Sequence, residues 1–161
     1  MSTQRSASRL TQAMADLIEV HRAGFVATVN ADGTPNLSPK GTFIILNEQR
    51  LAFGEIRSPN TRRNIDAGSL VEVNFLDVFS RKGVRIRGKA TCADRGSAEF
   101  ETLLSKFASW PTLIDRFRAI ITIDIESAKM ITTPAYDVGA TEEELIAKYQ
   151  EHFARSLADR R

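Results

Sequence analysis

This 161-residue chain has a single cysteine, two histidines and no long apolar run, which together argue against disulfide-bonded, zinc-binding and membrane-spanning classes of protein. With only Cys92 present, no disulfide can form within the chain, and a reducing cytoplasm is the expected compartment. His21 and His152 lie far apart, outside any zinc-ligand spacing. No apolar run approaches the about 20 residues needed to span a membrane, so no membrane association is expected.

The common sequence signatures of side-chain catalysis are also missing. The chain contains no GxSxG nucleophile elbow, P-loop or GxGxxG turn. Asp124 and Glu126 share one face of a strand near its exposed end, which is typical of a solvated edge. If the protein carries out a reaction, we expect a bound cofactor to supply the chemistry.

The charge balance gives little support to a nucleic-acid partner. The formal net charge is +2. A small barrel that binds nucleic acid through Arg85, Arg87 and Lys89 would need aromatic side chains between these cations, and the stretch has none. Residues 1–8 are polar and lack an apolar signal-peptide core, so we expect a disordered tail.

Hydrophobic periodicity predicts one mainly β domain over residues 1–161 with flanking helices. Helices are expected at 8–22, 97–107 and 141–159, and Thr141 with Glu144 forms a capping box. The apolar, β-branched runs predict about six strands, at 25–29, 35–46 (interrupted near Pro39), 51–56, 70–77, 84–89 and 120–126. Because the connections are short and do not alternate strand with helix, an antiparallel barrel is favoured over a doubly wound sheet.

The segment of residues 58–65 predicts a helix that begins just where a buried strand ends. Ser58 is a suitable N-cap, and Pro59 fits the first helical turn. The start of such a helix offers free backbone N–H groups and a positive dipole end, which together favour a phosphate. The alternative is a capped connector whose two arginines are solvated.

Several segments, in this order, resemble the pyridoxamine 5′-phosphate oxidase-like flavoproteins. The hairpin of residues 24–41, which reads GFVATVNADGTPNLSPKG, is similar to the opening hairpin of that family. Residues 58–65 resemble its phosphate-binding turn, residues 83–90 its G-x-x-x-x-G-x-A strand, and residues 117–123 a closing strand of its small FMN-binding members. The resemblance covers roughly residues 20–130. It implies a six-stranded antiparallel split β-barrel of Greek-key type that forms a homodimer and holds FMN between its subunits.

The resemblance also implies which residues contact the flavin. Those expected at or near the isoalloxazine ring are Ser38, Pro39, Lys40, Gly41, Thr42, Gly54 and Glu55. Gly54 would allow close approach of the ring. Asn60 and Thr61 would bind the phosphate, and Asn64 either joins them or holds the helix to the barrel. Arg81 and Lys82 lie in a loop that a dimer can bring to the neighbouring flavin; alternatively, both are solvated.

The departures from the family pattern affect the expected activity. Pyridoxamine-phosphate oxidases carry an arginine or lysine where this chain has Asn60 and Thr61, an arginine-led run at residues 38–42, and an Arg/His segment at their end. We therefore expect an FMN-dependent oxidoreductase with a different small substrate, or with NAD(P)H as donor. The alternatives are a non-catalytic FMN-binding electron carrier and a haem-binding split barrel, for which His152 is the candidate ligand.

Overall fold

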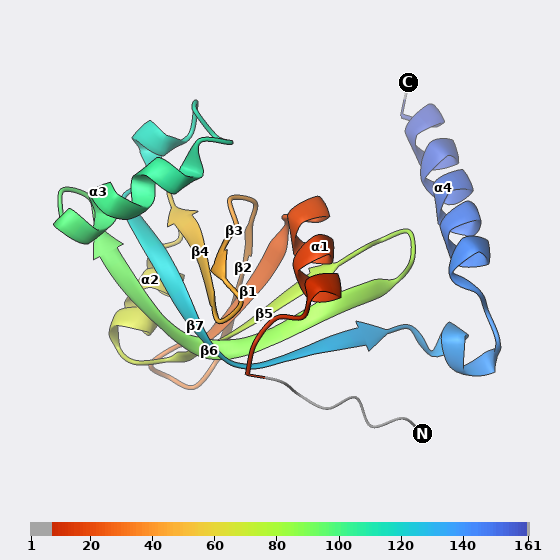
Figure 1. Ribbon diagram of the computed structural model, residues 1–161, viewed down its shortest axis with the longest axis horizontal. Helices are drawn as coiled ribbons and strands as arrows, with labels where there is room; N and C mark the ends of the chain where they lie inside the picture. Colours follow the sequence, from red (N-terminus) through yellow and green to blue (C-terminus); the bar gives the residue numbers. More distant parts are fainter. Residues whose placement is uncertain (1–7, 161) are drawn as a thin grey trace.

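An antiparallel sheet of seven strands curls around the main core of the protein in the computed structural model, which describes residues 8–160 (Figure 1). The strands are β1 (Gly24–Val29), β2 (Pro35–Lys40), β3 (Ile44–Asn47), β4 (Arg50–Glu55), β5 (Leu70–Leu76), β6 (Lys82–Asp94) and β7 (Ala119–Thr132). Their order across the sheet is β2-β1-β5-β6-β7-β4-β3. This arrangement confirms the mainly β, antiparallel fold class.

Four α-helices and three short 3-10 helices flank the sheet. They are α1 (Gln12–Val20), α2 (Pro59–Asp66), α3 (Ala98–Leu104), η1 (Ser105–Phe107), η2 (Ile114–Arg116), η3 (Pro134–Val138) and α4 (Glu142–Ala158). The first helix begins four residues later than predicted, because the Thr11 side chain accepts a hydrogen bond from the backbone N–H of Met14 and caps it. The tail expected at residues 1–8 lies, apart from Ser8, outside the described residues.

The sheet has seven strands rather than six because the run predicted over 35–46 divides in two. Its first half, β2, pairs with β1, and its second half, β3, pairs with β4 at the opposite edge of the sheet. Residues 41–43 therefore cross between the two edge strands. This crossing lies beside the site described below.

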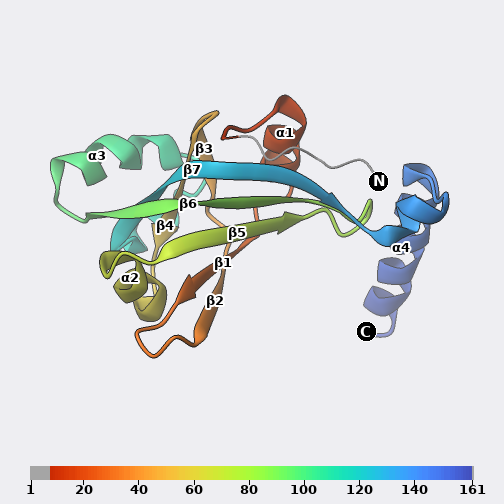
Figure 2. The same ribbon diagram turned by 90° about the horizontal axis from the view of Figure 1, so that it is seen from below.

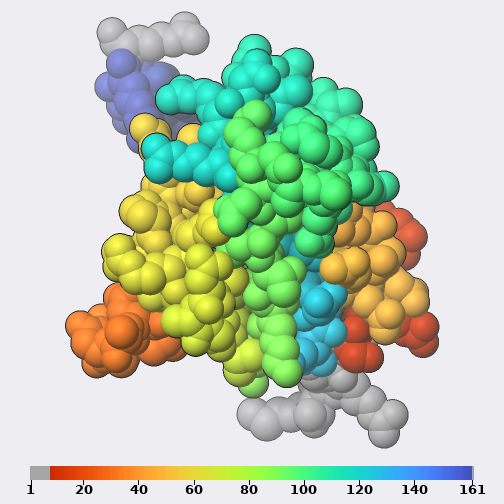
Figure 3. Space-filling model, turned by 90° about the vertical axis from the view of Figure 1, so that its left-hand side faces the viewer, coloured from red at the N-terminus to blue at the C-terminus, as the bar shows by residue number. Residues whose placement is uncertain are grey.

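Two aromatic clusters form the core on either side of the sheet. Inside the barrel, the Phe43 ring lies 5.1 Å from that of Phe53 and 4.8 Å from that of Phe75, and α1 covers this cluster. Outside it, Phe107 and Phe117 pack beneath α3 with their ring centroids 5.2 Å apart. Figure 3 shows the face where α2 (yellow) lies beside the end of β6 (green).

The C-terminal helix stands apart from the barrel. After β7 the chain passes through η3 and enters α4, which projects beside the tip of the β5–β6 connection (Figures 1 and 2). The predicted capping box is confirmed: the Thr141 hydroxyl accepts from the Glu144 N–H, and the Glu144 carboxylate accepts from the Thr141 N–H. No helix within residues 8–160 is both long and apolar enough to cross a membrane.

Candidate functional site

A cleft of about 440 Å³ opens where the β2–β3 crossing passes the end of β4. Six of the residues that the sequence places at the flavin ring line it: Ser38, Pro39, Lys40, Gly41, Thr42 and Gly54. Four further residues complete the lining: Ile56, Arg57, Trp110 and Leu113. The volume falls within the range of about 300–1,000 Å³ typical of small-molecule sites.

Thr42 fixes the crossing to the end of β4. Its buried hydroxyl accepts from the Gly54 N–H at 3.0 Å and lies 3.3 Å from the Gly54 carbonyl oxygen, to which it can donate. Since Ile44 pairs with Ala52, Thr42 stands opposite Gly54 in the same antiparallel register. The backbone pairing of β3 with β4 ends at Ile44 and Ala52. At Gly54, the Thr42 side chain makes the hydrogen bonds that a paired strand would otherwise make.

The core around Gly54 leaves no room for a side chain. A Cβ atom at this position would lie 2.2 Å from the ring of Phe117. Packing against Phe117 is thus one reason for a glycine here; because the Gly54 backbone also lines the cleft, close approach of a flavin ring stays a prediction. A Cβ atom on Gly41, by contrast, would meet nothing within 4 Å.

Lys40 places a partly desolvated cation in the cleft. Its ammonium donates to the Ser38 hydroxyl at 2.6 Å and lies 5.9 Å from the centre of the Phe53 ring. Burial lowers the pKa of Lys40, and the nearby Glu55 charge opposes that effect. With Arg57 also in its lining, the cleft carries two basic side chains.

Trp110 and Leu113 add apolar surface to that of Pro39 and Ile56, and the sequence alone does not predict either of them as a lining residue. They belong to the segment between α3 and β7, more than fifty residues from the β2–β3 crossing. The Arg22 guanidinium lies 5.0 Å from the centre of the Trp110 indole. No local pattern marks these residues, whereas Arg57 could have been found from its place directly before the predicted phosphate turn.

The start of α2 differs from the predicted cap. Pro59 does occupy the first turn, but the Ser58 side chain makes no cap hydrogen bond to the helix. Instead, the Ser58 N–H and hydroxyl both donate to Oε1 of Glu55, which is 3% exposed. Glu55 therefore places a buried negative charge before the helix and turns its carboxylate toward Ser58 rather than into the cleft.

The remaining polar residues of α2 mostly tie the helix to the sheet. Asn64 donates to the Thr28 hydroxyl at 3.0 Å and to the Asn30 side-chain oxygen at 2.8 Å. The buried Thr61 hydroxyl accepts from Asn36 at 3.1 Å and keeps a proton that it can donate. These contacts match the alternative in which Asn64 holds the helix to the barrel; its contact with a ligand stays a prediction.

The exposed side of α2 carries Asn60 and the two arginines. Arg62 bonds to Asp66 at 3.1 Å and to Asp94 at 2.6 Å, and the bond with Asp94 raises the pKa of Arg62. Arg63 donates to the Asn60 side-chain oxygen at 3.3 Å. Arg62 is thus bound to the last residue of β6, Asp94, while the Asn60 side chain remains exposed at the helix start.

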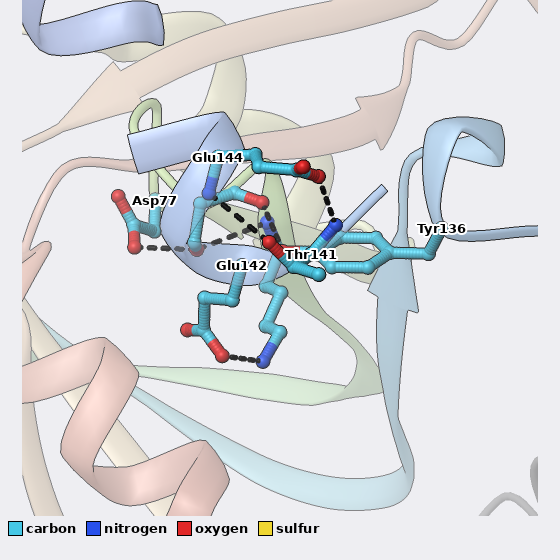
Figure 4. A network of polar contacts seen from close by, with 7 residues as sticks. Asp77, Tyr136, Thr141, Glu142 and Glu144 are labelled. Atoms are coloured by element: carbon cyan, nitrogen blue, oxygen red, sulfur yellow. Dashed lines mark hydrogen bonds and ion pairs between the residues drawn. The ribbon is translucent and has the colours of Figure 1, made fainter. Parts of the chain in front are cut away.

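Arg81 and Lys82 are absent from the cleft and are held by the C-terminal segment instead. The Arg81 guanidinium lies 4.8 Å from the centre of the Tyr149 ring, and the Lys82 ammonium pairs with Glu142. Figure 4 shows Glu142 at the start of α4 with its ion pair dashed. Within one chain, therefore, the structure brings residues 38–42 and 54 together but leaves residues 81 and 82 elsewhere.

The other charged clusters noted in the sequence form ion pairs on the sheet surface. Arg85 and Arg87 both face Glu72, at 3.5 Å, and Lys89 lies 3.6 Å from Glu126. Asp124 pairs with Arg50 at 2.7 Å.

Burial raises the pKa of Cys92 to about 12, so its thiol is protonated at neutral pH. Between residues 8 and 160, no cluster of three or more histidine, cysteine or carboxylate side chains could hold a metal ion.

Comparisons with known proteins agree with this fold. A structure from Lactobacillus delbrueckii with the provisional name pyridoxamine 5′-phosphate oxidase is 25% identical, covers 78% of this chain and 97% of its own, and superposes with a TM-score of 0.66. Two more distant structures show the fold alone. An FMN-binding protein from Syntrophomonas wolfei is 14% identical, with 74% and 84% coverage and a TM-score of 0.57. The haem storage protein HutZ from Vibrio cholerae is 19% identical, with 77% and 94% coverage and a TM-score of 0.58.

No curated protein sequence matches the chain. The model of the pyridoxamine 5′-phosphate oxidase family matches residues 10–131. This range includes every strand of the sheet except the last residue of β7, Thr132. The matched range contains the cleft, the α2 turn and the β5–β6 loop. The chain therefore belongs to the pyridoxamine 5′-phosphate oxidase family.

Proposed function

We propose that the protein is a homodimeric oxidoreductase that binds FMN in the cleft between β2, β3 and β4. The observation that carries this proposal is the convergence of residues 38–42, Gly54 and Trp110 on one cleft. Ile56 and Arg57 line the same cleft and lead directly into α2, so a ring in the cleft has a helix start nearby for its phosphate.

The lining suits the two chemically different parts of a flavin mononucleotide. Pro39, Trp110 and Leu113 would contact the apolar faces of the ring, while Lys40 and Ser38 would meet its polar edge. The backbone N–H groups at the start of α2, with the Thr61 hydroxyl, would take the phosphate. When bound, FMN supplies hydride and single-electron transfer.

The protein's own contribution is electrostatic. Lys40 is held by Ser38 within the cleft, and Arg57 adds a second positive charge there. Fixed cations at the polar edge of the ring stabilise negative charge that develops on it. Since the cleft contains no carboxylate or histidine side chain, we assign no residue as a general acid or base.

A second copy of the chain would close the cleft. The outward face of β1 and β2 is apolar: Phe25 is 45% exposed and Leu37 is 64% exposed. Phe25 stands directly opposite Pro39, which also lines the cleft. A partner that covers this face would therefore reach the cleft, and burial of exposed side chains of this size favours association.

The absorbance spectrum of the purified protein tests the proposal. Flavin bands, as purified or after addition of FMN, are the expected result, and their absence in both samples would refute it. Turnover of NAD(P)H or of another donor separates the oxidoreductase from a non-catalytic electron carrier. A Soret band without flavin bands would instead favour the haem-binding alternative, for which His152 lies exposed on α4.

A further inference from the structure

The β5–β6 loop holds Arg81 in an unusual backbone conformation. Among the described residues, Arg81 is the one non-glycine residue with a positive φ angle, +60°. A side chain other than glycine rarely adopts this region, and it persists only where its surroundings enforce it. Such conformations occur often at ligand sites, so the contacts that hold Arg81 call for a functional explanation.

The first set of contacts is internal to the loop. The Arg81 N–H donates to the Asp77 carbonyl oxygen at 2.9 Å, and the Asp77 N–H donates to the Lys82 carbonyl oxygen at 2.8 Å. The Asp77 carboxylate accepts from the Phe79 N–H at 2.9 Å and from the Ser80 hydroxyl. These bonds form the turn but do not contact the Arg81 guanidinium.

The second set comes from the C-terminal segment, which contacts four consecutive residues, three in the loop and Lys82 at the start of β6. The Phe79 ring packs edge-on against Phe153, with centroids 5.7 Å apart, and the Ser80 carbonyl oxygen accepts from the Tyr136 hydroxyl at 2.6 Å. Arg81 stacks on Tyr149, and Lys82 forms an ion pair with Glu142. Figure 4 shows Tyr136 and Glu142 on the C-terminal side of these contacts.

This segment lies beyond the part of the chain that the family model matches, since that match ends at residue 131. Leu145, which is 5% exposed, is the one buried residue of α4. No residue of α4 belongs to either core cluster, whereas Tyr149 and Phe153 of this helix contact the β5–β6 loop.

The two cations of the loop are treated differently. Glu142 neutralises Lys82, whereas Arg81 lies against an uncharged aromatic ring. A guanidinium that stacks on a ring keeps its in-plane N–H groups for a planar or anionic acceptor. The loop therefore presents one oriented set of donors, that of Arg81.

We propose that Tyr149 is a positioning residue that holds Arg81 for contact with an anionic or carbonyl group of a ligand bound in the cleft of a second copy. This inference rests on the proposed function, because it takes FMN as the ligand and a homodimer as the assembly. Because Tyr149 fixes the Arg81 side chain before the ligand binds, less conformational entropy is lost on binding. The contact between Tyr149 and Arg81 should therefore increase the affinity for the ligand.

The affinity of FMN, measured by titration calorimetry, tests the coupling of the two residues. Tyr149→Ala is expected to weaken FMN about twofold to fivefold, the range of an exposed cation–π contact, and Tyr149→Phe to leave it unchanged. Because Tyr149 acts through Arg81, Arg81→Ala and the double variant should bind FMN equally. Losses that multiply in the double variant, or an unchanged affinity in Tyr149→Ala, would overturn the proposal.

Cleavage by trypsin after Arg81 provides a readout that needs no flavin. Tyr149→Ala should speed this cleavage, whereas Gln150→Ala, an exposed position on the same helix, should not. An unchanged rate in Tyr149→Ala would overturn the positioning role. If the unaltered protein binds no FMN, the proposed function fails, while the trypsin result still decides whether Tyr149 holds Arg81. Circular dichroism of both variants checks that α4 remains folded.

Discussion

Replacing Thr42 by valine should destabilise the protein through two buried backbone groups of Gly54. Valine has nearly the same shape as threonine but has no hydroxyl, so the Gly54 N–H loses its acceptor at 3.0 Å and the Gly54 carbonyl a donor at 3.3 Å. Thr42 is 6% exposed, which leaves little room for water to replace these bonds. An unsatisfied buried group costs about 1–3 kcal/mol. The carbonyl is the weaker case, because its hydrogen bond is long.

We therefore expect Thr42→Val to lower the free energy of unfolding by about 2–4 kcal/mol. For a chain of this size, that loss lowers the midpoint of thermal unfolding by roughly 6–12 °C. Urea unfolding followed by circular dichroism measures it directly. Thr42→Ser is the matched control, because it keeps the hydroxyl and should lose less than half as much stability.

A Thr42→Val protein within about 0.5 kcal/mol of the unaltered protein would refute this reasoning, since that is the scatter of an ordinary surface substitution. It would mean that Gly54 finds other partners and that Thr42 does not hold the β2–β3 crossing. The geometry of the cleft would then have to depend on other contacts.

Three further predictions concern the core, the phosphate and acid stability. Gly54→Ala places a methyl group 2.2 Å from the Phe117 ring and should cost about 1–3 kcal/mol in urea unfolding, whereas Gly41→Ala, in open space, should be neutral. Asn60→Ala combined with Thr61→Ala should weaken FMN by roughly 2–4 kcal/mol in titration calorimetry, and an unchanged affinity would move the phosphate site elsewhere. Asp77 should contribute to acid unfolding. Burial raises the pKa of Asp77. The hydrogen bonds from Ser80 and the Phe79 N–H, together with the nearby His21, lower it by more, so the folded pKa lies below the ordinary value. The stability that Asp77 contributes is therefore present above pH about 4 and lost as the pH falls through its folded pKa. Unfolding midpoints at pH 7 and pH 3 should differ less in Asp77→Asn than in the unaltered protein, and equal differences would exclude this role.

The amino-acid sequence alone identifies the features that depend on near neighbours along the chain. The Asp32-Gly33 pair predicts a turn with a positive φ angle, and Gly33 has a φ of +82°. The capping box at Thr141 and the proline in the first turn of α2 are likewise confirmed. The order of the motifs from residue 24 to residue 123 indicates the family, and the same resemblance groups residues 38–42 with Gly54, which line one cleft.

Only the tertiary structure decided the features that depend on distant partners. Trp110 and Leu113 join the cleft because the segment after α3 folds back over β4. Arg81 stacks on Tyr149, which lies 68 residues further along the chain. Local propensity and periodicity act over a few residues, whereas these contacts are set by packing between elements. The sequence by itself therefore determined the kind of barrel and the segments at its site, and the packing of those segments determined which side chains face a ligand and which hold the barrel together.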